Sequence, residues 1–174
     1  MAIPSTRRRW RLLLVGAALA LALAIPSSAL ADTTATPTIY PADSRGATVT
    51  LTGGSIVGRL VANTTVTFTC DPFLVYDWET GQEVESTEGR LEDGSVTILQ
   101  ASGRTINYGQ VGFWGGSVVC DGGTVNRRDL GVVASVSPWR SGSVVAGATV
   151  YIASADYNSS HFASTGPVTI RLGR

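Results

Sequence analysis

The two cysteines, Cys70 and Cys120, are the residues whose chemistry follows most directly from the sequence, because they can form a disulfide. Each closes a run in which apolar residues alternate with others, and this places both on the apolar side of a strand. Neither a Cys-x-x-Cys spacing nor neighbouring histidines suggest a redox-active or metal-binding pair. The pattern therefore predicts a structural disulfide that joins two strands across a β core.

His161 is the only histidine, so any acid–base chemistry by imidazole would depend on it. Ser160 or Ser164 together with Asp156 supplies the residue types of a Ser-His-Asp set, but no serine has the surroundings of a nucleophile elbow. We expect His161 in a polar connection between the last two strands. The chain also lacks a plausible zinc ligand set, a phosphate-binding loop and a dinucleotide fingerprint. The sequence thus favours a protein that is not an enzyme and that has no cofactor.

Residues 71–93 contain eight acidic side chains and one basic side chain, Arg90. Thr80-Gly81, at the centre of this segment, predicts a hairpin with two open registers. A two-residue loop would bring Glu83 and Glu85 onto the apolar face of the preceding strand. A three-residue loop keeps them off that face and is favoured, because burying carboxylates is costly.

The favoured register gathers Asp77, Glu79, Glu83 and Glu85 on one outer face of the hairpin. Like charges in directly opposed positions destabilise a sheet by up to about 1 kcal/mol per pair. Either the acids form a solvated face, or Ca²⁺ relieves the repulsion with oxygen ligands. No Asp-x-Asp-x-Asp loop supports calcium. We expect the solvated face and retain these four residues as the calcium alternative.

Tryptophan residues provide the other candidate site. Trp78 shares a strand face with Leu74 and Tyr76 and is expected to pack on the core near the disulfide. Trp114 and Trp139 lie at irregular places in the pattern. Exposed tryptophans on a rigid β scaffold can stack on sugar rings or insert into a pocket of a partner. Trp114 and Trp139 are therefore the candidate ligand-binding residues, although the favoured interpretation is that each covers an end of the domain.

Short strands must position all of these side chains. Alternation of period two and clusters of turn residues recur along the chain, with no helical periodicity of useful length after the amino-terminal segment. Turns are expected at Gly53-Gly54, Asp93-Gly94 and residues 121–123. The pattern predicts an all-β fold with about seven to nine antiparallel strands.

The amino terminus has the pattern of a secretory signal peptide. A cationic stretch ending at Arg11 precedes an apolar run of 14 residues, Leu12–Ile25. Residues 29–31 have the small-x-small pattern that predicts cleavage between Ala31 and Asp32. The apolar run is shorter than the roughly 18–20 residues that span a bilayer. We expect a secreted, extracellular protein without a membrane span after cleavage.

The expected organisation is a signal peptide at 1–31, a loose leader at 32–46 and a single domain at 47–174. The basic residues are all arginine, and cleavage would leave nine of them against thirteen acids, a formal net charge of −4. No basic stripe remains to bind the phosphate backbone of a nucleic acid. The sequence therefore argues against a nucleic-acid partner.

Several short motifs together resemble small secreted bacterial immunoglobulin-like proteins. They are Gly53-Gly54, Val66-x-Phe68-x-Cys70, Cys120-Asp121-Gly122, Ala146-Gly147-Ala148-x-Val150 and Val168-x-Ile170-x-Leu172. The resemblance implies an immunoglobulin-like β-sandwich in which Ala146-Gly147 is the turn into a late strand. It also implies that Cys120 falls earlier than in antibody domains, so the disulfide would not be the antibody-type bridge. The resemblance covers most of the chain after the signal and concerns the fold, with no activity attached.

Three functions are compatible with these observations. The favoured one is a monomeric, non-catalytic extracellular binding or accessory module that recognises cell-wall glycan, another polysaccharide or a protein. The second is a carrier of a small apolar ligand that resembles secreted chromoprotein-type sandwiches, although these usually carry two disulfides. The third is a secreted hydrolase that depends on His161.

Overall fold

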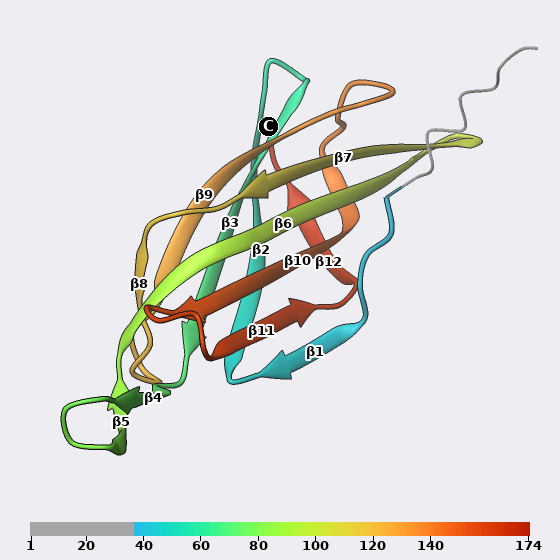
Figure 1. Ribbon diagram of the computed structural model, residues 1–174. Coiled ribbons are helices and arrows are strands. Elements are labelled where there is room, and N and C mark those ends of the chain that lie inside the picture. The colour runs from blue at the N-terminus through green and yellow to red at the C-terminus, as the bar shows by residue number, and fades with distance from the viewer. Residues whose placement is uncertain (1–36) are drawn as a thin grey trace, which may run out of the picture. The chain divides into compact units, whose positions relative to one another are not determined.

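The computed structural model describes residues 37–174, in which all regular elements are β-strands and no helix occurs (Figure 1). No helix in this range is thus long and apolar enough to cross a membrane. The expected signal peptide at 1–31 and the cleavage position between Ala31 and Asp32 lie outside the described residues. The all-β prediction is confirmed, but the described chain forms twelve strands, more than the sequence predicts.

Two long strands, β6 (Glu88–Ser102) and β10 (Gly142–Ser154), pair with each other in a seven-stranded antiparallel sheet. Two short strands lie end to end along the other edge of each long strand: β12 and β11 beside β10, and β7 and β8 beside β6. The first strand, β1, pairs with β11 at the edge. The bounds of the shorter strands are β1 (Ala42–Arg45), β7 (Thr105–Phe113), β8 (Ser117–Val119), β11 (Ser160–Thr165) and β12 (Val168–Leu172).

A second antiparallel sheet has the order β2 (Ala47–Val57), β3 (Val61–Cys70) and β9 (Asn126–Val133). In β3 the predicted alternation is confirmed, because Val66 and Phe68 are buried while Thr65, Thr67 and Thr69 alternate with them and are partly exposed. On the outer face, threonine hydroxyl groups of β2 and β3 pair across the strands: those of Thr48 and Thr69 lie 2.7 Å apart. A third, two-stranded sheet is the hairpin of β4 (Phe73–Asp77) and β5 (Gln82–Ser86).

The two larger sheets face each other across one apolar core, to which both contribute alternate strand residues such as Phe68 and Ile98. Backbone hydrogen bonds also join the sheets at their edges. The Ile56 N–H donates to the Gly173 carbonyl at 3.0 Å, and the Ser135 N–H donates to the Tyr108 carbonyl at 2.8 Å. The core is therefore closed along both sides by main-chain contacts.

The predicted disulfide between Cys70 and Cys120 is confirmed, and it connects the two larger sheets. Cys70 ends β3 in the three-stranded sheet, whereas Cys120 directly follows β8 in the seven-stranded sheet. The two Cα atoms are 4.5 Å apart and both side chains are buried. The bond thus ties the sheets together at one end.

Several expected turns are wrong. Gly53-Gly54 lies within β2, Asp93-Gly94 within β6 and Ala146-Gly147 within β10. These glycines serve close packing: a Cβ atom on Gly94 would lie 2.4 Å from the ring of Phe113, and one on Gly147 would lie 2.2 Å from Ile39. A glycine in a strand can mark such a close approach as readily as a turn.

The prediction of a loose leader at 32–46 is wrong for residues 42–45. Ala42–Arg45 form β1, which pairs with β11. Before it, Ile39 packs over Gly147 on the outer face of β10. The missing side chain at Gly147 makes room for the isoleucine, so the segment before β1 covers part of the sheet.

Removing the disulfide should lower the free energy of unfolding by about 4 kcal/mol, because it closes a long loop in the unfolded chain. The two cysteines are 50 residues apart. Urea unfolding of the oxidised protein and of a Cys70→Ala/Cys120→Ala variant measures the difference. A reducing agent should leave the unfolding of the double variant unchanged, which controls for other effects of the reductant. A loss below about 1 kcal/mol would contradict the chain-entropy account.

Candidate functional site

The β4–β5 hairpin extends beyond the ends of the two larger sheets (Figure 1). Its strands pair only with each other, in a register that sets Tyr76 opposite Glu83 and Leu74 opposite Glu85. Asp77 pairs with Gln82, so four residues connect the strands. Both expected loop lengths, two and three residues, are therefore wrong.

The orientation of the hairpin is the reverse of the one expected. Phe73 is 1% exposed and packs into the core, so the odd-numbered positions of β4 face inward. Leu74 and Tyr76 consequently face solvent, together with the two glutamates opposite them. Because side chains alternate along a strand, one buried anchor at the start of β4 decides the direction of the other positions.

Three large side chains form an exposed surface on this hairpin, which we call the hairpin aromatic face: Leu74, Tyr76 and Trp78. They are 58%, 46% and 85% exposed, respectively. The Trp78 ring meets the Tyr76 ring edge to face, with centroids 4.7 Å apart. The expectation that Trp78 packs on the core is wrong. Contiguous exposed apolar side chains of this kind mark interaction sites.

Asp77 holds the loop that carries Trp78. Its carboxylate accepts hydrogen bonds from the Glu79 N–H at 2.9 Å and from the Thr80 hydroxyl at 2.7 Å. The Gly81 N–H donates to the Asp77 carbonyl at 2.8 Å, and Gly81 has a φ of 69°, which suits glycine. The Thr80 hydroxyl and the Glu79 N–H also lower the pKa of the Asp77 carboxyl.

The four carboxylates of the calcium alternative are not gathered on one face. Asp77 is bonded within the loop, Glu79 belongs to that loop, and Glu83 and Glu85 flank the hairpin aromatic face. Residues 37–174 contain no group of three or more acidic, histidine or cysteine side chains placed to hold a metal ion. The expected clustering depended on the three-residue loop, and it is lost with that register.

His161 supports the base of the hairpin. It lies within β11, so its expected position in a connection is wrong. Its ring stacks on Phe73 with centroids 4.3 Å apart and 12° between the planes, and its Nε2 lies 2.9 Å from the Asp71 carbonyl oxygen. The Asp156 carboxylate bonds instead to Ser154 and Asn158. Asp156 and His161, two members of the Ser-His-Asp set considered from the sequence, thus have separate partners.

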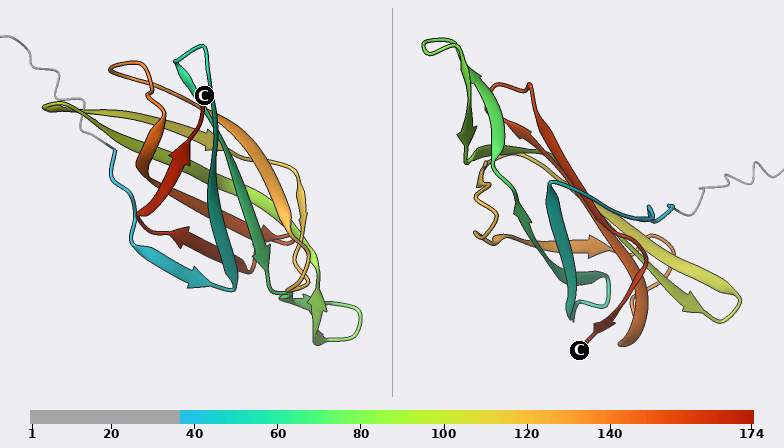
Figure 2. Two further views of the ribbon diagram at one scale, coloured as in Figure 1. Left: turned by 180° about the vertical axis from the view of Figure 1, so that it is seen from behind. Right: turned by 90° about the horizontal axis from the view of Figure 1, so that it is seen from below.

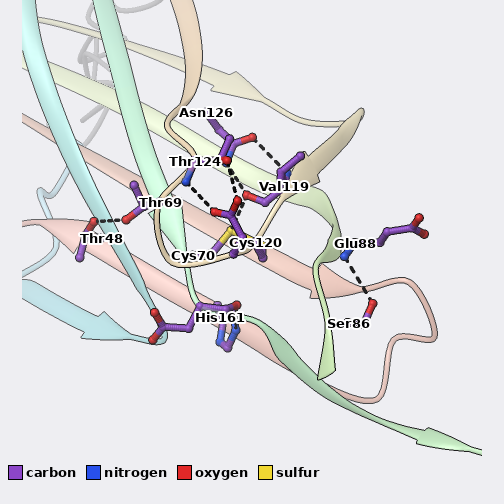
Figure 3. The surroundings of a disulfide bond; sticks show 12 residues. Thr48, Thr69, Cys70, Ser86, Glu88, Val119, Cys120, Thr124, Asn126 and His161 are labelled. Atoms are coloured by element: carbon purple, nitrogen blue, oxygen red, sulfur yellow. Dashed lines mark hydrogen bonds between the residues drawn. A yellow bond between two sulfur atoms is a disulfide. The ribbon is translucent and has the colours of Figure 1, made fainter. Parts of the chain in front are cut away.

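The disulfide lies at the same base, because β4 begins three residues after Cys70 (Figure 3). The amide side chain of Asn126 bonds the Val119 backbone in both directions, at 3.0 and 3.2 Å. The Gly122 N–H donates to the Cys70 carbonyl at 2.8 Å. The base of the hairpin is thus held in place, although its outer part projects into solvent.

A hollow of about 700 Å³ lies next to this base, between the outer face of β6 and β8 and the connection from β10 to β11. Arg90, Ser117 and Tyr157 line it. Tyr157 is exposed and has a φ of 60°, in the left-handed region that non-glycine residues rarely adopt. The Ser159 hydroxyl, in the same connection, donates to the Leu74 carbonyl at 3.1 Å. This connection therefore links the hollow to the hairpin.

The two tryptophans selected from the sequence differ in environment. Trp114 is 75% exposed in the connection from β7 to β8, so its binding role stays a prediction. Trp139 is 2% exposed, and its indole N–H donates to the Val132 carbonyl at 3.0 Å. Trp139 is therefore buried, as expected if it covers an end of the domain.

Sequence reasoning missed Leu74 and Tyr76 as surface residues. One signal could have identified them: the acidic segment that follows β4. A strand paired only with a carboxylate-rich partner cannot bury the face that it shares with those carboxylates.

Comparisons with protein-family models, with curated protein sequences and with solved structures found no significant match.

Hydrogen bonds in the turn after Cys120 predict a low pKa for the Asp121 carboxyl. The N–H groups of Thr124 and Gly123 and the Thr124 hydroxyl bond to the Asp121 carboxylate at 2.6, 2.9 and 2.7 Å. They lower the pKa of Asp121 from 3.8 to about 2. Because the folded-state pKa lies below the unfolded value, this contribution to stability is complete above pH 3.8 and is lost as the pH falls towards 2.

An NMR titration of the side-chain carboxyl carbons should therefore give Asp121 a midpoint near pH 2 in the folded protein. Thr124→Val, which removes one of the donors, should raise that midpoint. A midpoint near 3.8 in the unaltered protein would contradict the observed hydrogen bonds.

Proposed function

We propose that this protein is a secreted, non-catalytic extracellular binding module that contacts its partner through the hairpin aromatic face. The observation that carries the proposal is the 85% exposure of Trp78, packed against Tyr76, on a hairpin with a rigid base. Keeping a large indole in water is unfavourable for an isolated domain, and burial of that ring in a partner removes the cost. Tryptophan and tyrosine are also the residues most often found at the energetic centre of interfaces.

The rigid base favours affinity. Binding requires that the contact residues be ordered, and a surface that is already ordered loses less entropy on association. The stacking of Phe73 on His161 and the bonds of Asp77 order the two ends of β4 before a partner arrives. Little rearrangement of the hairpin is needed to bind.

Secretion is part of the proposal. It is supported by the signal-peptide pattern at 1–31, with cleavage between Ala31 and Asp32, and by the disulfide, which is compatible with an oxidising compartment. An immunoglobulin-like sandwich is also proposed. Two antiparallel sheets that face each other over one core, with a disulfide between them, support it.

The charge around the hairpin aromatic face suggests the chemistry of the partner. Glu85 lies opposite Leu74 and Glu83 lies opposite Tyr76, on the same face as the aromatic rings. A cationic group can pair with these carboxylates and also approach the ring face of Trp78. The partner that fits is a polysaccharide with free amino groups, in which sugar rings stack on the aromatic side chains.

The hairpin should bind cross-linked chitosan beads at a mildly acidic pH, where the free amines are protonated and the cross-links keep the polymer insoluble, more strongly than chitin, in which the amines are acetylated. Trp78→Ala should weaken binding to chitosan by at least about tenfold, because the central aromatic contact is lost. Co-sedimentation of purified protein over a range of polysaccharide concentrations measures both effects.

Trp114→Ala is the matched control, because it also removes an exposed tryptophan without changing the net charge. If the hairpin aromatic face alone makes the contact, the binding of Trp114→Ala equals that of the unaltered protein, whereas weaker binding of Trp114→Ala would support the role predicted for Trp114 from the sequence. If Trp78→Ala binds chitosan as well as the unaltered protein, the proposed contact surface is wrong. Equal binding to chitin and chitosan would refute the cationic partner.

A further inference from the structure

A second hollow, of about 720 Å³, is lined by residues of the β2–β3 turn, of the segment before β10 and by the final residue. The β2–β3 turn and the carboxyl end lie at the end of the sheets away from the hairpin (Figure 2). Three arginines line the hollow: Arg59, Arg140 and Arg174. Trp139 and Ile56 form part of the wall, and no acidic side chain lines the hollow. We call it the arginine hollow.

Three arginines of the described chain, Arg45, Arg90 and Arg127, have carboxylate partners at 2.8, 3.1 and 2.8 Å. The other six described arginines have no carboxylate within the 4.0 Å ion-pair distance. Three of these six, Arg59, Arg140 and Arg174, line the same hollow. Positive charge is therefore concentrated here on a chain with an excess of acids after residue 31. Like charges in one hollow repel, and a bound anion relieves the repulsion.

The backbone beneath two of these arginines is held in place. The Trp139 N–H donates to the Arg59 carbonyl at 2.8 Å. The buried amide of Gln100 bonds the Arg140 backbone in both directions, at 2.7 and 2.9 Å. The two segments that carry Arg59 and Arg140 are thus tied to each other and to β6.

Arg59 also has an unusual conformation, with a φ of 65°. Among residues 37–174, Arg59 and Tyr157 are the non-glycine residues with positive φ, and each lines one of the two hollows of about 700 Å³. The conformation of Arg59 belongs to the β2–β3 turn, in which Gly58 also has a positive φ of 57° and the Leu60 N–H donates to the Val57 carbonyl at 3.3 Å. Positive φ at both central residues is typical of a tight hairpin turn, which fixes the backbone that carries Arg59.

We propose that the arginine hollow binds the phosphate group of a phosphorylated sugar. The forked guanidinium group donates two parallel hydrogen bonds to phosphate oxygens. A phosphate monoester carries about 1.5 to 2 negative charges at pH 7, so it can pair with more than one arginine, whereas a carboxylate carries only one. The hollow has the size of small-molecule sites, roughly 300–1,000 Å³, and leaves room for a sugar ring beside the phosphate.

The proposal is tested by titrating isotope-labelled protein with glucose 1-phosphate, inorganic phosphate and glucuronate while recording amide and indole N–H signals by NMR. Glucose 1-phosphate should produce saturable shifts of the Trp139 indole N–H and of the Arg59 and Ser141 amides, which belong to lining residues. Inorganic phosphate should shift the same signals at higher concentration, and glucuronate should bind at least about tenfold more weakly than glucose 1-phosphate.

The Arg59→Gln/Arg140→Gln variant should lose at least about tenfold in affinity, since each substitution removes charge-assisted hydrogen bonds. Both side chains are exposed, and an unchanged unfolding temperature would verify that the variant folds. Arg104→Gln removes an exposed charge in the β6–β7 turn, outside the hollow, and should bind normally. Absence of saturable shifts, unchanged affinity of the double variant, or equal binding of glucuronate would overturn the proposal.

Discussion

The disulfide between Cys70 and Cys120 is the constraint on which the candidate site depends. It joins β3 of one sheet to the end of β8 in the other, and β4 begins only three residues beyond Cys70. A two-stranded hairpin alone is marginally stable in water. Here its first residue, Phe73, is buried beside the bond and stacked on His161. The covalent link between the sheets thus provides the rigid base from which the hairpin aromatic face projects.

The long pair of β6 and β10 has a comparable role for the arginine hollow. Gln100, near the end of β6, is buried and bonds both backbone groups of Arg140. The same sheet reaches the hollow beside the hairpin through Arg90 near the start of β6. One sheet therefore contributes to both hollows, and each hollow is lined by a non-glycine residue in the left-handed backbone conformation, Tyr157 or Arg59. The two proposed binding regions differ in charge: glutamates flank the hairpin aromatic face, and arginines line the arginine hollow.

The all-β fold class could be predicted, but the exposure of the hairpin aromatic face could not. The alternation around Val66 and Phe68 identified a strand with one buried face, because that face meets a continuous core. The same rule failed at Trp78. It assigns apolar side chains to the inside, yet the inward direction in β4 is set by Phe73 and its contact with His161, which lies 88 positions further along the chain. Local pattern left two roles open for Trp139, binding a ligand or covering an end of the domain, and its burial and the bond of its indole to the Val132 carbonyl decide for the second.

The sequence by itself determined that the described chain is all-β, which residues line the face of β3 towards the core, and that the two cysteines pair. These features follow from local alternation and from the presence of only two thiols. Tertiary structure alone decided that Asp93-Gly94 and Ala146-Gly147 lie within long strands, since the space left by each glycine is filled by Phe113 or Ile39. It also decided the outward direction of Trp78 and the convergence of Arg59 with Arg140. Such features depend on which distant strand covers a given face, and a strand pattern of period two carries no information about that partner.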